Sequence, residues 1–449
     1  MLGEAKIREL LSSAIARSPA DETEVVLLSG DQALTRFANN TIHQNVAETD
    51  VSIAVRVAVG RHLGSAITNR PMADALGRAI DRATSVARLA PETADFPGLP
   101  EPQTPKPVRA FDDAVAGASA RWRAERVREV LRLAQSSGAM AAGALCAGIA
   151  EVAVANSRGV FCYHAGTRAR FNLVISKDGA SGHAQRAAWR LDDLDFEGLA
   201  RTAVQRALRA RQPRPVEPGT YPVVLEPYAV QDIVGHLAFS GMGALAVQEG
   251  RSWMNGRLGD RAMSERITII DDGCDTAGLP MPFDHEGVPK ERVTIVDRGV
   301  PVGPVYDTTT AAKEGRRSTG HAVPRAWPEF AAFGPLPVHL FVAAGDAAIE
   351  EMVQQVSRGL YVTRFWYTRL VHPRDCVVTG MTRDGVFWIE DGEIAYPVRN
   401  LRFTQGYVQA LAAVNRVGAD TWLLSGGFGS VRVPALSVSE FTFTGVTEF

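Results

Sequence analysis

Cysteine is scarce in this sequence of 449 residues, which contains only Cys146, Cys162, Cys274 and Cys376. The four lie far apart, and no two of them form a CxxC pair. This spacing argues against a disulfide framework and against a zinc ribbon, because both need grouped cysteines. A reducing, cytoplasmic setting is the simplest interpretation.

Long apolar runs and a strong net charge are missing as well. No stretch reaches the roughly 18 apolar residues that a membrane-spanning helix needs. The first residues, MLGEAKIRELLSS, break their apolar positions with charges, which predicts an amphipathic helix and not a signal peptide. A formal net charge of −2 provides no overall field to attract nucleic acid or an anionic membrane. We therefore expect neither nucleic acid nor a membrane as a partner.

The common catalytic signatures are absent too. The sequence has no GxGxxG after a strand, no Walker A loop, no GxSxG elbow and no HExxH helix. These absences remove the usual grounds for predicting a dinucleotide-binding enzyme, a nucleotide hydrolase, a serine hydrolase or a common zinc protease. From the residues alone, the chain is a soluble α+β protein without a recognisable active site.

The composition that is present is ordinary for a globular protein, with 46% apolar and 22% charged residues. The length favours two domains. The segment RPVEPGTYPVVLEPYAV marks a change of character near residue 216. We expect an N-terminal α+β domain over residues 1–215 and a β-rich domain over residues 216–449.

The N-terminal half repeats a pattern of strands followed by a helix. Strands are expected within 24–69 and again within 147–176, and a helix follows each group, at 72–90 and at 196–212. The pattern predicts an α/β-type domain of strand–helix repeats within an overall α+β fold, with a hint of internal duplication. A connection with six prolines, residues 91–111, cannot be regular helix or central strand.

The C-terminal half is expected to be mainly strands with Gly and Pro turns. A helix is predicted from about Val230 to Met254, and one more enters a strand within AAIEEMVQQVSRGLYVTRFWY. The last 80 or so residues predict strands with one helix.

Three short patterns could carry chemistry. FDHEGVP places Asp284, His285 and Glu286 in a row, but adjacent side chains rarely converge on one metal, and Asp and Gly commonly build turns. HPRDC sets His372 and Cys376 at a helical ligand spacing, yet the proline after His372 favours a loop entering a strand.

STGH, residues 318–321, contains a serine and His321 that could form a nucleophile pair. The Ser-Thr-Gly sequence is also ordinary loop chemistry. The structural interpretation is therefore the more economical one for all three patterns.

Several longer segments resemble one known family. They are LTRFANNTIHQNVAETDVSIAVRVAVGRHLGSAITN, VAVANSRGV, GRSWMNGRLGDRAMSERITIIDDG, PFDHEGVPKERVTIVDRGVPVGPVYDTTTAAKEGRRSTG and VFWIEDGEIAYPVRNLRFTQGYVQALAAVNRVGAD. Together, and in this order, they resemble the TldD/PmbA family, also called modulators of DNA gyrase. The resemblance covers nearly the whole chain.

The resemblance implies one of two kinds of subunit. The TldD type looks like a zinc peptidase with an HExxxH helix and a cysteine ligand near its C-terminus, whereas the TldE (PmbA) type is its partner and lacks these ligands. The two types are understood to form a heterodimer that degrades unfolded peptides or trims modified precursor peptides. The peptide is thought to enter a cavity between the subunits and to pair by β-strand addition.

The window that matches HExxxH is GHLAFS, residues 235–240. Gly235 stands at the first histidine position, His236 at the glutamate position and Ser240 at the second histidine position. The stretch matching the family's cysteine, residues 423–445, contains none. Glycine offers no side chain, serine is a poor zinc ligand, and the general base is missing. The chain therefore resembles the TldE type. Zinc is expected only in a TldD-type subunit, with which this chain would form a heterodimer. The alternative partner is a second copy of this chain, in a homodimer.

Four residues remain as weak catalytic candidates: His236, His285, Glu286 and His321. The leading hypothesis is a non-catalytic subunit of a peptidase complex that binds an extended peptide. The alternative is a stand-alone enzyme of a specialised natural-product pathway, working as a homo-oligomer with these residues or Cys376 and without the standard zinc site. A gyrase-associated regulator is a third reading, and the near-neutral charge counts against it.

Overall fold

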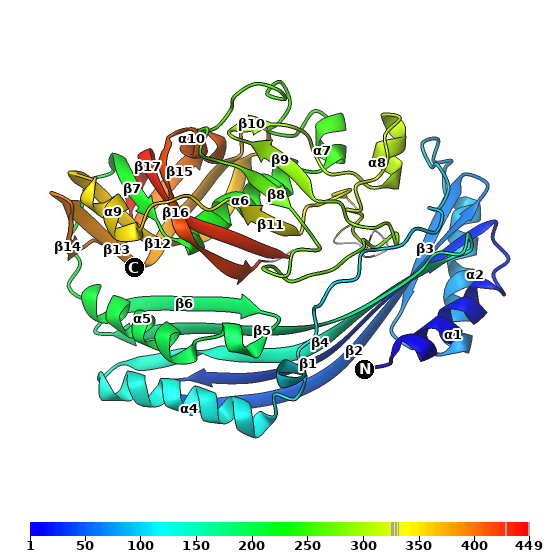
Figure 1. The fold of residues 1–449 in the computed structure, drawn as a ribbon, viewed down its shortest axis with the longest axis horizontal. Coiled ribbons are helices and arrows are strands. Elements are labelled where there is room, and N and C mark those ends of the chain that lie inside the picture. Colours follow the sequence, from blue (N-terminus) through cyan, green and yellow to red (C-terminus); the bar gives the residue numbers. More distant parts are fainter. Residues whose placement is uncertain (325–326, 328–329, 331, 427–428, 448–449) are drawn as a thin grey trace.

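The computed structural model describes residues 1–324, 327, 330, 332–426 and 429–447. Its first half builds a long six-stranded sheet, and its second half builds an eleven-stranded sheet above it (Figure 1). No helix in these ranges is long and apolar enough to cross a membrane.

The first half contains six strands and six helices within the described residues. The elements are α1 (Glu4–Ile15), β1 (Glu22–Ala38), β2 (Thr41–Val59), β3 (His62–Thr68), α2 (Ala73–Leu89), α3 (Asp113–Ala116), α4 (Ala120–Ser136), β4 (Met140–Asn156), β5 (Phe161–Lys177), β6 (Ala180–Ala188), the 3-10 turn η1 (Leu191–Asp193) and α5 (Phe196–Arg209).

The six strands have the order β3-β2-β1-β4-β5-β6, and every neighbouring pair is antiparallel. The prediction of strand–helix repeats is correct, but the prediction of an α/β-type domain is wrong. The strands within each repeat follow one another through tight turns, and such hairpins force antiparallel pairing. No helix separates the three strands of a group from one another, so the layout is α+β.

The sheet order is symmetric about its centre. The unit β1-β2-β3-α2 and the unit β4-β5-β6-α5 meet along the β1–β4 pair, each with its last strand at an outer edge. Two apolar clusters follow this division, one under α1 and α2 and one under α4 and α5. The arrangement agrees with the internal repeat that the sequence suggests.

Both faces of the sheet are covered, as the alternation of side chains along a strand allows. Val25 and Leu27 of β1 pack under α1 and α2, whereas Val26 between them points to the opposite face. There it meets Met281 and Phe283 of the second half. Each half of the chain thus supplies part of the other's core.

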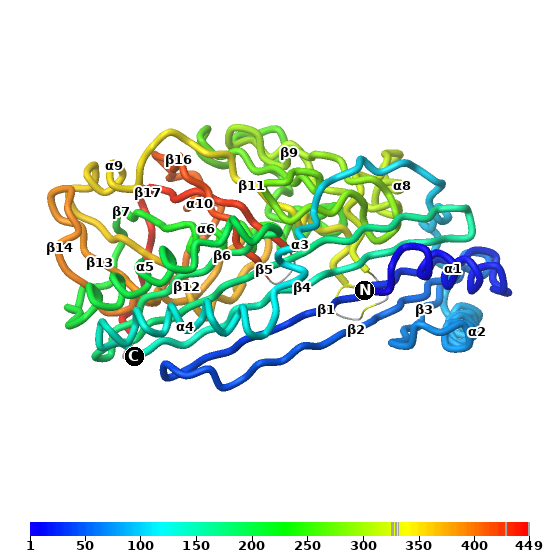
Figure 2. The backbone as a smooth tube through the Cα atoms, turned by 60° about the horizontal axis from the view of Figure 1, so that its bottom comes forward, coloured from blue at the N-terminus to red at the C-terminus, as the bar shows by residue number. Residues whose placement is uncertain are grey.

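The proline-rich connection forms neither helix nor strand over residues 91–111, as predicted. It runs from α2 to α3 along the sheet (Figure 2). Phe96 and Leu99 are buried against Ala58, and the Leu99 amide donates to the Glu22 carboxylate at 2.6 Å. The connection is therefore held in place along its length.

The second half contains the remaining elements. They are β7 (Gly219–Leu225), α6 (Pro227–Gly241), α7 (Ala244–Gln248), β8 (Ile269–Asp271), β9 (Val293–Asp297), β10 (Val300–Pro301), α8 (Thr308–Lys313), β11 (His339–Val342), α9 (Ile349–Gln354), β12 (Arg358–His372), the 3-10 turn η2 (Pro373–Asp375), β13 (Val377–Glu390), β14 (Glu393–Pro397), β15 (Leu401–Gly406), α10 (Tyr407–Ala412), β16 (Val414–Ser425) and β17 (Ser430–Val446).

These strands form a mixed sheet with a closed part. Strands β7, β12, β13, β15 and β17 pair in sequence, and β17 pairs again with β7, so the five complete a ring. Helix α6 follows β7 and contributes to the large apolar cluster that these strands share. It is therefore held by the most extensive core of the protein.

The helix predicted from Val230 to Met254 is two helices, α6 and α7, separated at Met242 and Gly243. Gly243 has extended backbone and bridges Val305. A Cβ there would lie 2.0 Å from the carbonyl oxygen of Pro335. The close approach of two backbones needs glycine, and this contact ends the helix.

Candidate functional site

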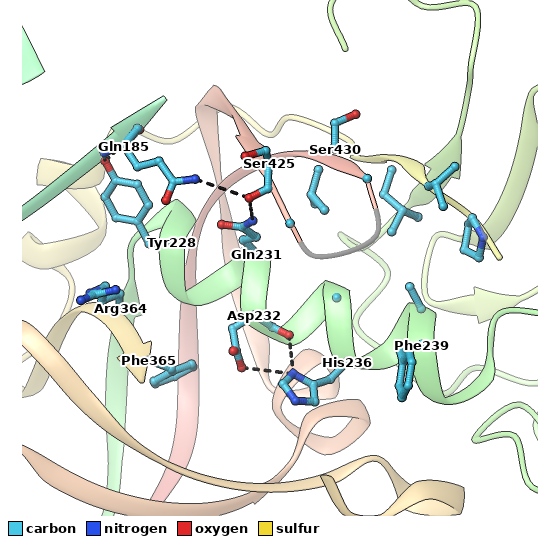
Figure 3. Close-up of a pocket in the computed structure, with 18 of the residues that line it drawn as sticks. Gln185, Tyr228, Gln231, Asp232, His236, Phe239, Arg364, Phe365, Ser425 and Ser430 are labelled. Atoms are coloured by element: carbon cyan, nitrogen blue, oxygen red, sulfur yellow. Dashed lines mark hydrogen bonds and ion pairs between the residues drawn. The ribbon is translucent and has the colours of Figure 1, made fainter. Parts of the chain in front are cut away.

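A cavity of about 520 Å³ lies between β6 of the first half and α6, β11, β12 and the β16–β17 hairpin of the second (Figure 3). This volume is within the range typical of sites for small molecules and peptide segments. The cavity is bordered by elements from distant parts of the sequence, so only the complete fold creates it.

Helix α6 forms one wall of the cavity, and its other faces are anchored in the core. Pro227 begins the helix, where a missing N–H costs nothing. Ile233 and Leu237 are fully buried among the strands of the second half. With this side fixed, the opposite side can carry polar groups in a defined position.

The cavity side of α6 presents Asp232, Gly235, His236 and Phe239. Their three- and four-residue spacings bring them onto one side of a helix. A Cβ added at Gly235 would meet no atom within 4 Å, so open space lies beside His236.

Asp232 and His236 form a carboxylate–imidazole pair (Figure 3). The Asp232 carboxylate accepts from Tyr407 Oη at 2.6 Å and from Thr368 Oγ1 at 2.7 Å. His236 Nδ1 lies 3.0 Å from the Asp232 main-chain oxygen and 3.4 Å from Oδ1. Both neighbours are acceptors, which places a proton on Nδ1. Nε2 has no hydrogen-bond partner among the described residues.

The charge of Asp232 decides the protonation of His236. Burial lowers the pKa of His236, but the hydrogen bond and the charge of Asp232 outweigh burial and leave the pKa above its usual value. Burial and the same carboxylate raise the pKa of Tyr407 well above its usual value, so Tyr407 stays a neutral donor. His236 is therefore easily protonated, and its Nε2 is free to bind another group.

The positions that match the family's zinc motif do not converge. Gly235 and His236 line the cavity, but Ser240 is buried on another side of α6, with Oγ 3.5 Å from Cys376 Sγ. Within the described residues no three His, Cys, Asp or Glu side chains are grouped as metal ligands. The donors present do not fit zinc, which needs three or four converging N, S or O ligands.

The β16–β17 hairpin faces α6 across the cavity. Ser425 ends β16 and Ser430 begins β17, and both line the cavity. The side-chain amides of Gln231 and Gln185 both donate to the Ser425 main-chain oxygen, at 3.0 and 3.4 Å. The two segments that the resemblance assigns to one zinc site, residues 235–240 and 423–445, therefore do border one cavity.

The third wall carries His183 on β6 and Arg364 on β12. His183 is 3% exposed, and neither of its ring nitrogens has a partner among the described residues. Burial, together with the charges of Arg364 and Arg206, holds its pKa well below the usual value. The Arg364 guanidinium is ion-paired with Asp384.

The Asp284–Glu286 loop, predicted as a turn or a weak metal site, is a buried turn. Asp284 accepts from the amides of Glu286, Val288 and Ala322, each at 2.9 Å. Burial and the neighbouring Glu286 carboxylate raise the pKa of Asp284 to about 7. His285 Nδ1 lies 3.1 Å from the Ala322 oxygen, and burial lowers its pKa to about 4. These contacts shape the loop.

Glu286 joins the two halves of the protein. It accepts from Arg56 Nη2 at 3.2 Å and from the amide and hydroxyl of Thr308 at 3.0 and 2.7 Å. Arg56 also forms a two-point ion pair with Glu24 of the neighbouring strand. The carboxylate of Glu286 therefore binds one residue of each half of the chain, Arg56 and Thr308. Its burial is explained by this structural role.

His321 is held on both ring nitrogens. Nε2 donates to Asp271 Oδ1 at 2.9 Å, and Nδ1 lies 2.9 Å from Thr319 Oγ1. Asp271 also accepts from the His339 amide at 2.7 Å. Ser318, the other member of the suggested nucleophile pair, bonds the Tyr306 main-chain oxygen. The geometry shows a structural network and no Ser–His pair.

His372 and Cys376 do not lie together either. His372 is exposed at the end of β12 and pairs with Asp375 at 3.1 Å. Cys376 is buried beside Ser240, and burial raises the pKa of its thiol to about 12. The loop entering a strand is confirmed, because a 3-10 turn separates β12 from β13.

The sequence reasoning missed Asp232, Tyr407, Thr368 and His183. Asp232 had a detectable signal, because a carboxylate four residues before a histidine meets it on a helix. Tyr407 lies 175 positions from Asp232, and nothing local in the sequence reveals that contact.

Comparison with protein families matches three segments in order. Residues 23–87 match the PmbA/TldA metallopeptidase domain 1, residues 101–211 the central domain and residues 218–445 the C-terminal domain. Among curated proteins, the metalloprotease PmbA of Escherichia coli O157:H7 is 24% identical over 97% of this chain and 96% of its own length. A metalloprotease of Methanothermobacter thermautotrophicus is 26% identical, with 59% of each chain covered.

Solved structures have the same fold. TldE from Thermococcus kodakarensis superposes with a TM-score of 0.86 at 21% identity, covering 98% of this chain and 99% of that one. A putative modulator of a DNA gyrase from Thermotoga maritima has a TM-score of 0.86 at 18% identity, covering 97% and 100%. These likenesses establish the architecture.

Proposed function

Because the chain belongs to the PmbA/TldD metallopeptidase family, we propose that it is a TldE-like, zinc-free subunit of a two-subunit peptidase. Its partner would be a TldD-type subunit that supplies zinc and the general base. This chain would complete the chamber and hold an extended segment of an unfolded or modified peptide.

One observation carries the proposal. At the family's metal position this chain has open space at Gly235, a histidine paired with Asp232, and a buried Ser240 that points away from the cavity. A single substitution does not rebuild three converging ligands here. A cavity is present at this place, which agrees with a role in binding a peptide.

The test is reconstitution. The purified protein should not cleave an unfolded peptide, and neither should its separate partner candidate, a chain from the same genome that carries HExxxH. Cleavage should appear when the two are mixed. The matched control is a partner whose HExxxH glutamate is changed to glutamine, which should leave the mixture inactive. Cleavage by this chain alone would contradict the proposal.

A second candidate is a stand-alone enzyme working as a homo-oligomer without zinc. The observation that favours it is the Asp232–His236 pair, because a free imidazole nitrogen facing a cavity can transfer a proton. This reading predicts turnover by the pure protein that is lost in His236→Gln. The reconstitution experiment separates the two candidates.

A further inference from the structure

The α6 cavity contains hydrogen-bonding groups that the protein does not use. Two of its lining residues have buried atoms without a partner among the described residues: His183 at both ring nitrogens and Ser425 at Oγ. The third is the partly exposed His236, whose hydrogen bond to its own helix uses Nδ1 and leaves Nε2 unused. Buried polar groups in folded proteins are normally paired, so unpaired groups around one cavity indicate a ligand.

The unused groups can donate hydrogen bonds. The hydroxyl of Ser425 and the imidazoles of His183 and His236 each carry an N–H or O–H. The carboxylate of the cavity, Asp232, is already bound by Tyr407, Thr368 and His236. A cationic ligand group would therefore find no free carboxylate on α6, whereas an acceptor or an anion would find donors.

His236 is the group best placed to meet an anion. Asp232 fixes its ring through Nδ1 and stabilises its protonated form, which turns Nε2 into a charged donor. Gly235 leaves open space on the same side of the helix. Arg364 also lines the cavity, but its guanidinium is already paired with Asp384. The anion is thus expected beside His236.

The other residues that line the cavity indicate the chemistry of the rest of the ligand. Phe239, Phe365, Leu340 and Val431 present apolar surface, which suits an apolar side chain. The side-chain nitrogen of Gln231 is bonded to the Ser425 main-chain oxygen, so the side-chain oxygen of Gln231 is the atom that can accept from a peptide N–H.

We propose that this cavity binds the C-terminal carboxylate of a peptide, with the anion beside His236 and the apolar last side chain against Phe239 on the same helix. The inference rests on the proposed function for the peptide nature of the ligand. It adds which end of the peptide this subunit holds.

Calorimetric titration with defined peptides tests the inference. The probes are N-acetyl-Ala-Ala-Ala-Leu with a free carboxylate, the same peptide as its C-terminal amide, and N-acetyl-leucine. The acid should bind at least about tenfold more tightly than the amide, because a charge-assisted hydrogen bond is lost in the amide. N-acetyl-leucine should bind more weakly than the peptide acid.

Two variants locate the interaction. His236→Gln should bring the acid and the amide to within about threefold of each other, since glutamine keeps a polar group without the charge. Gly235→Leu should abolish binding of both peptides by filling the open space. His372→Gln, at the exposed end of β12, is the matched control and should bind like the natural protein. Melting temperatures no lower than that of the natural protein would show that the variants are folded.

The proposal is wrong if the acid and amide bind equally to the natural protein, if neither binds, or if Gly235→Leu leaves binding intact. Equal affinity for N-acetyl-leucine would show a small acid as the ligand and would overturn the peptide assignment. None of these results would decide the reconstitution experiment, because the mixed subunits can cleave peptides whichever end of the peptide this subunit holds. Failure of this inference and failure of the proposed function can therefore be told apart.

Discussion

The Asp284–Glu286 loop and the Asp232–His236 pair of α6 both bring carboxylates and a histidine together in the interior. In the loop, three backbone amides bind Asp284, and Arg56 and Thr308 bind Glu286. On α6, Asp232 is bound, but His236 keeps a free nitrogen beside a cavity.

The difference between the two regions lies in what the side chains leave unsatisfied. Buried groups that use their hydrogen bonds on their own chain stabilise the fold, whereas a group held in place with capacity to spare can bind something else. Residue type alone does not separate these cases. The predictions below test the division between a structural region and a binding region.

The largest expected effect is in the structural region. Arg56→Leu should lower the free energy of unfolding by about 3–5 kcal/mol, because Glu24 and Glu286 would lose the guanidinium that they share in the interior. Urea unfolding measures the change. Arg78→Ala, which removes an exposed pair with Asp74, is the control and should cost less than about 0.5 kcal/mol. Equal costs would contradict the assignment of Arg56 as the link between the halves.

The second effect depends on pH. Burial alone would raise the pKa of Asp271, but the charge of His321 and its hydrogen bond, with the charges of Lys290 and His339, outweigh burial and hold that pKa below its usual value. A carboxyl group whose pKa is lowered by folding stabilises the folded state at pH values above its unfolded pKa of about 4. This contribution is lost as the pH falls from that value through the folded pKa. Asp271→Asn should therefore cost about 1–3 kcal/mol near neutral pH and less in acid. Urea unfolding at neutral and acidic pH measures the cost. A cost that is the same in acid would contradict the lowered pKa of Asp271.

A smaller effect of opposite sign is expected in the binding region. Gly235→Leu places a better helix former where a Cβ meets nothing within 4 Å. The free energy of unfolding should stay the same or rise by up to about 1 kcal/mol. Urea unfolding beside the natural protein measures it. A loss of more than 1 kcal/mol would show that the space beside His236 is needed for folding and not for a ligand.

The smallest effect is a shift in a titration. Nuclear magnetic resonance should give His236 a pKa above the usual value, and Asp232→Asn should lower it, because the carboxylate is the source of the upward shift. A raised histidine pKa stabilises the fold below the unfolded pKa of about 6.5, and this contribution is lost as the pH rises through the folded pKa. An unchanged His236 titration in the variant would break the proposed pair.

Sequence patterns predicted much of the fold. The two strand–helix groups and the proline-rich connection follow from periodicity and turn residues. The prediction of an α/β-type first domain was wrong, because strand–helix alternation says nothing about which strands pair, and the pairs are all antiparallel. The break at Gly243 depends on Pro335, which lies 92 positions later and leaves no local signal.

The candidate site was half predictable. The resemblance pointed to residues 235–240 and 423–445, and the structure places both at one cavity. It could not show that Ser240 turns away or that Tyr407 and Thr368 orient Asp232, because these contacts exist only after the strands of the second half close around α6. His183 comes from the first half and joins the site only through the packing of the two sheets.

The most direct test of the central claim is the zinc content of the untagged protein, purified alone without chelators and measured by mass spectrometry. The account predicts near-zero zinc per chain, because the donors around α6 do not converge. About one zinc per chain would contradict it, and His236, His285, His321, His372 and Cys376 would then be the first residues to examine as ligands.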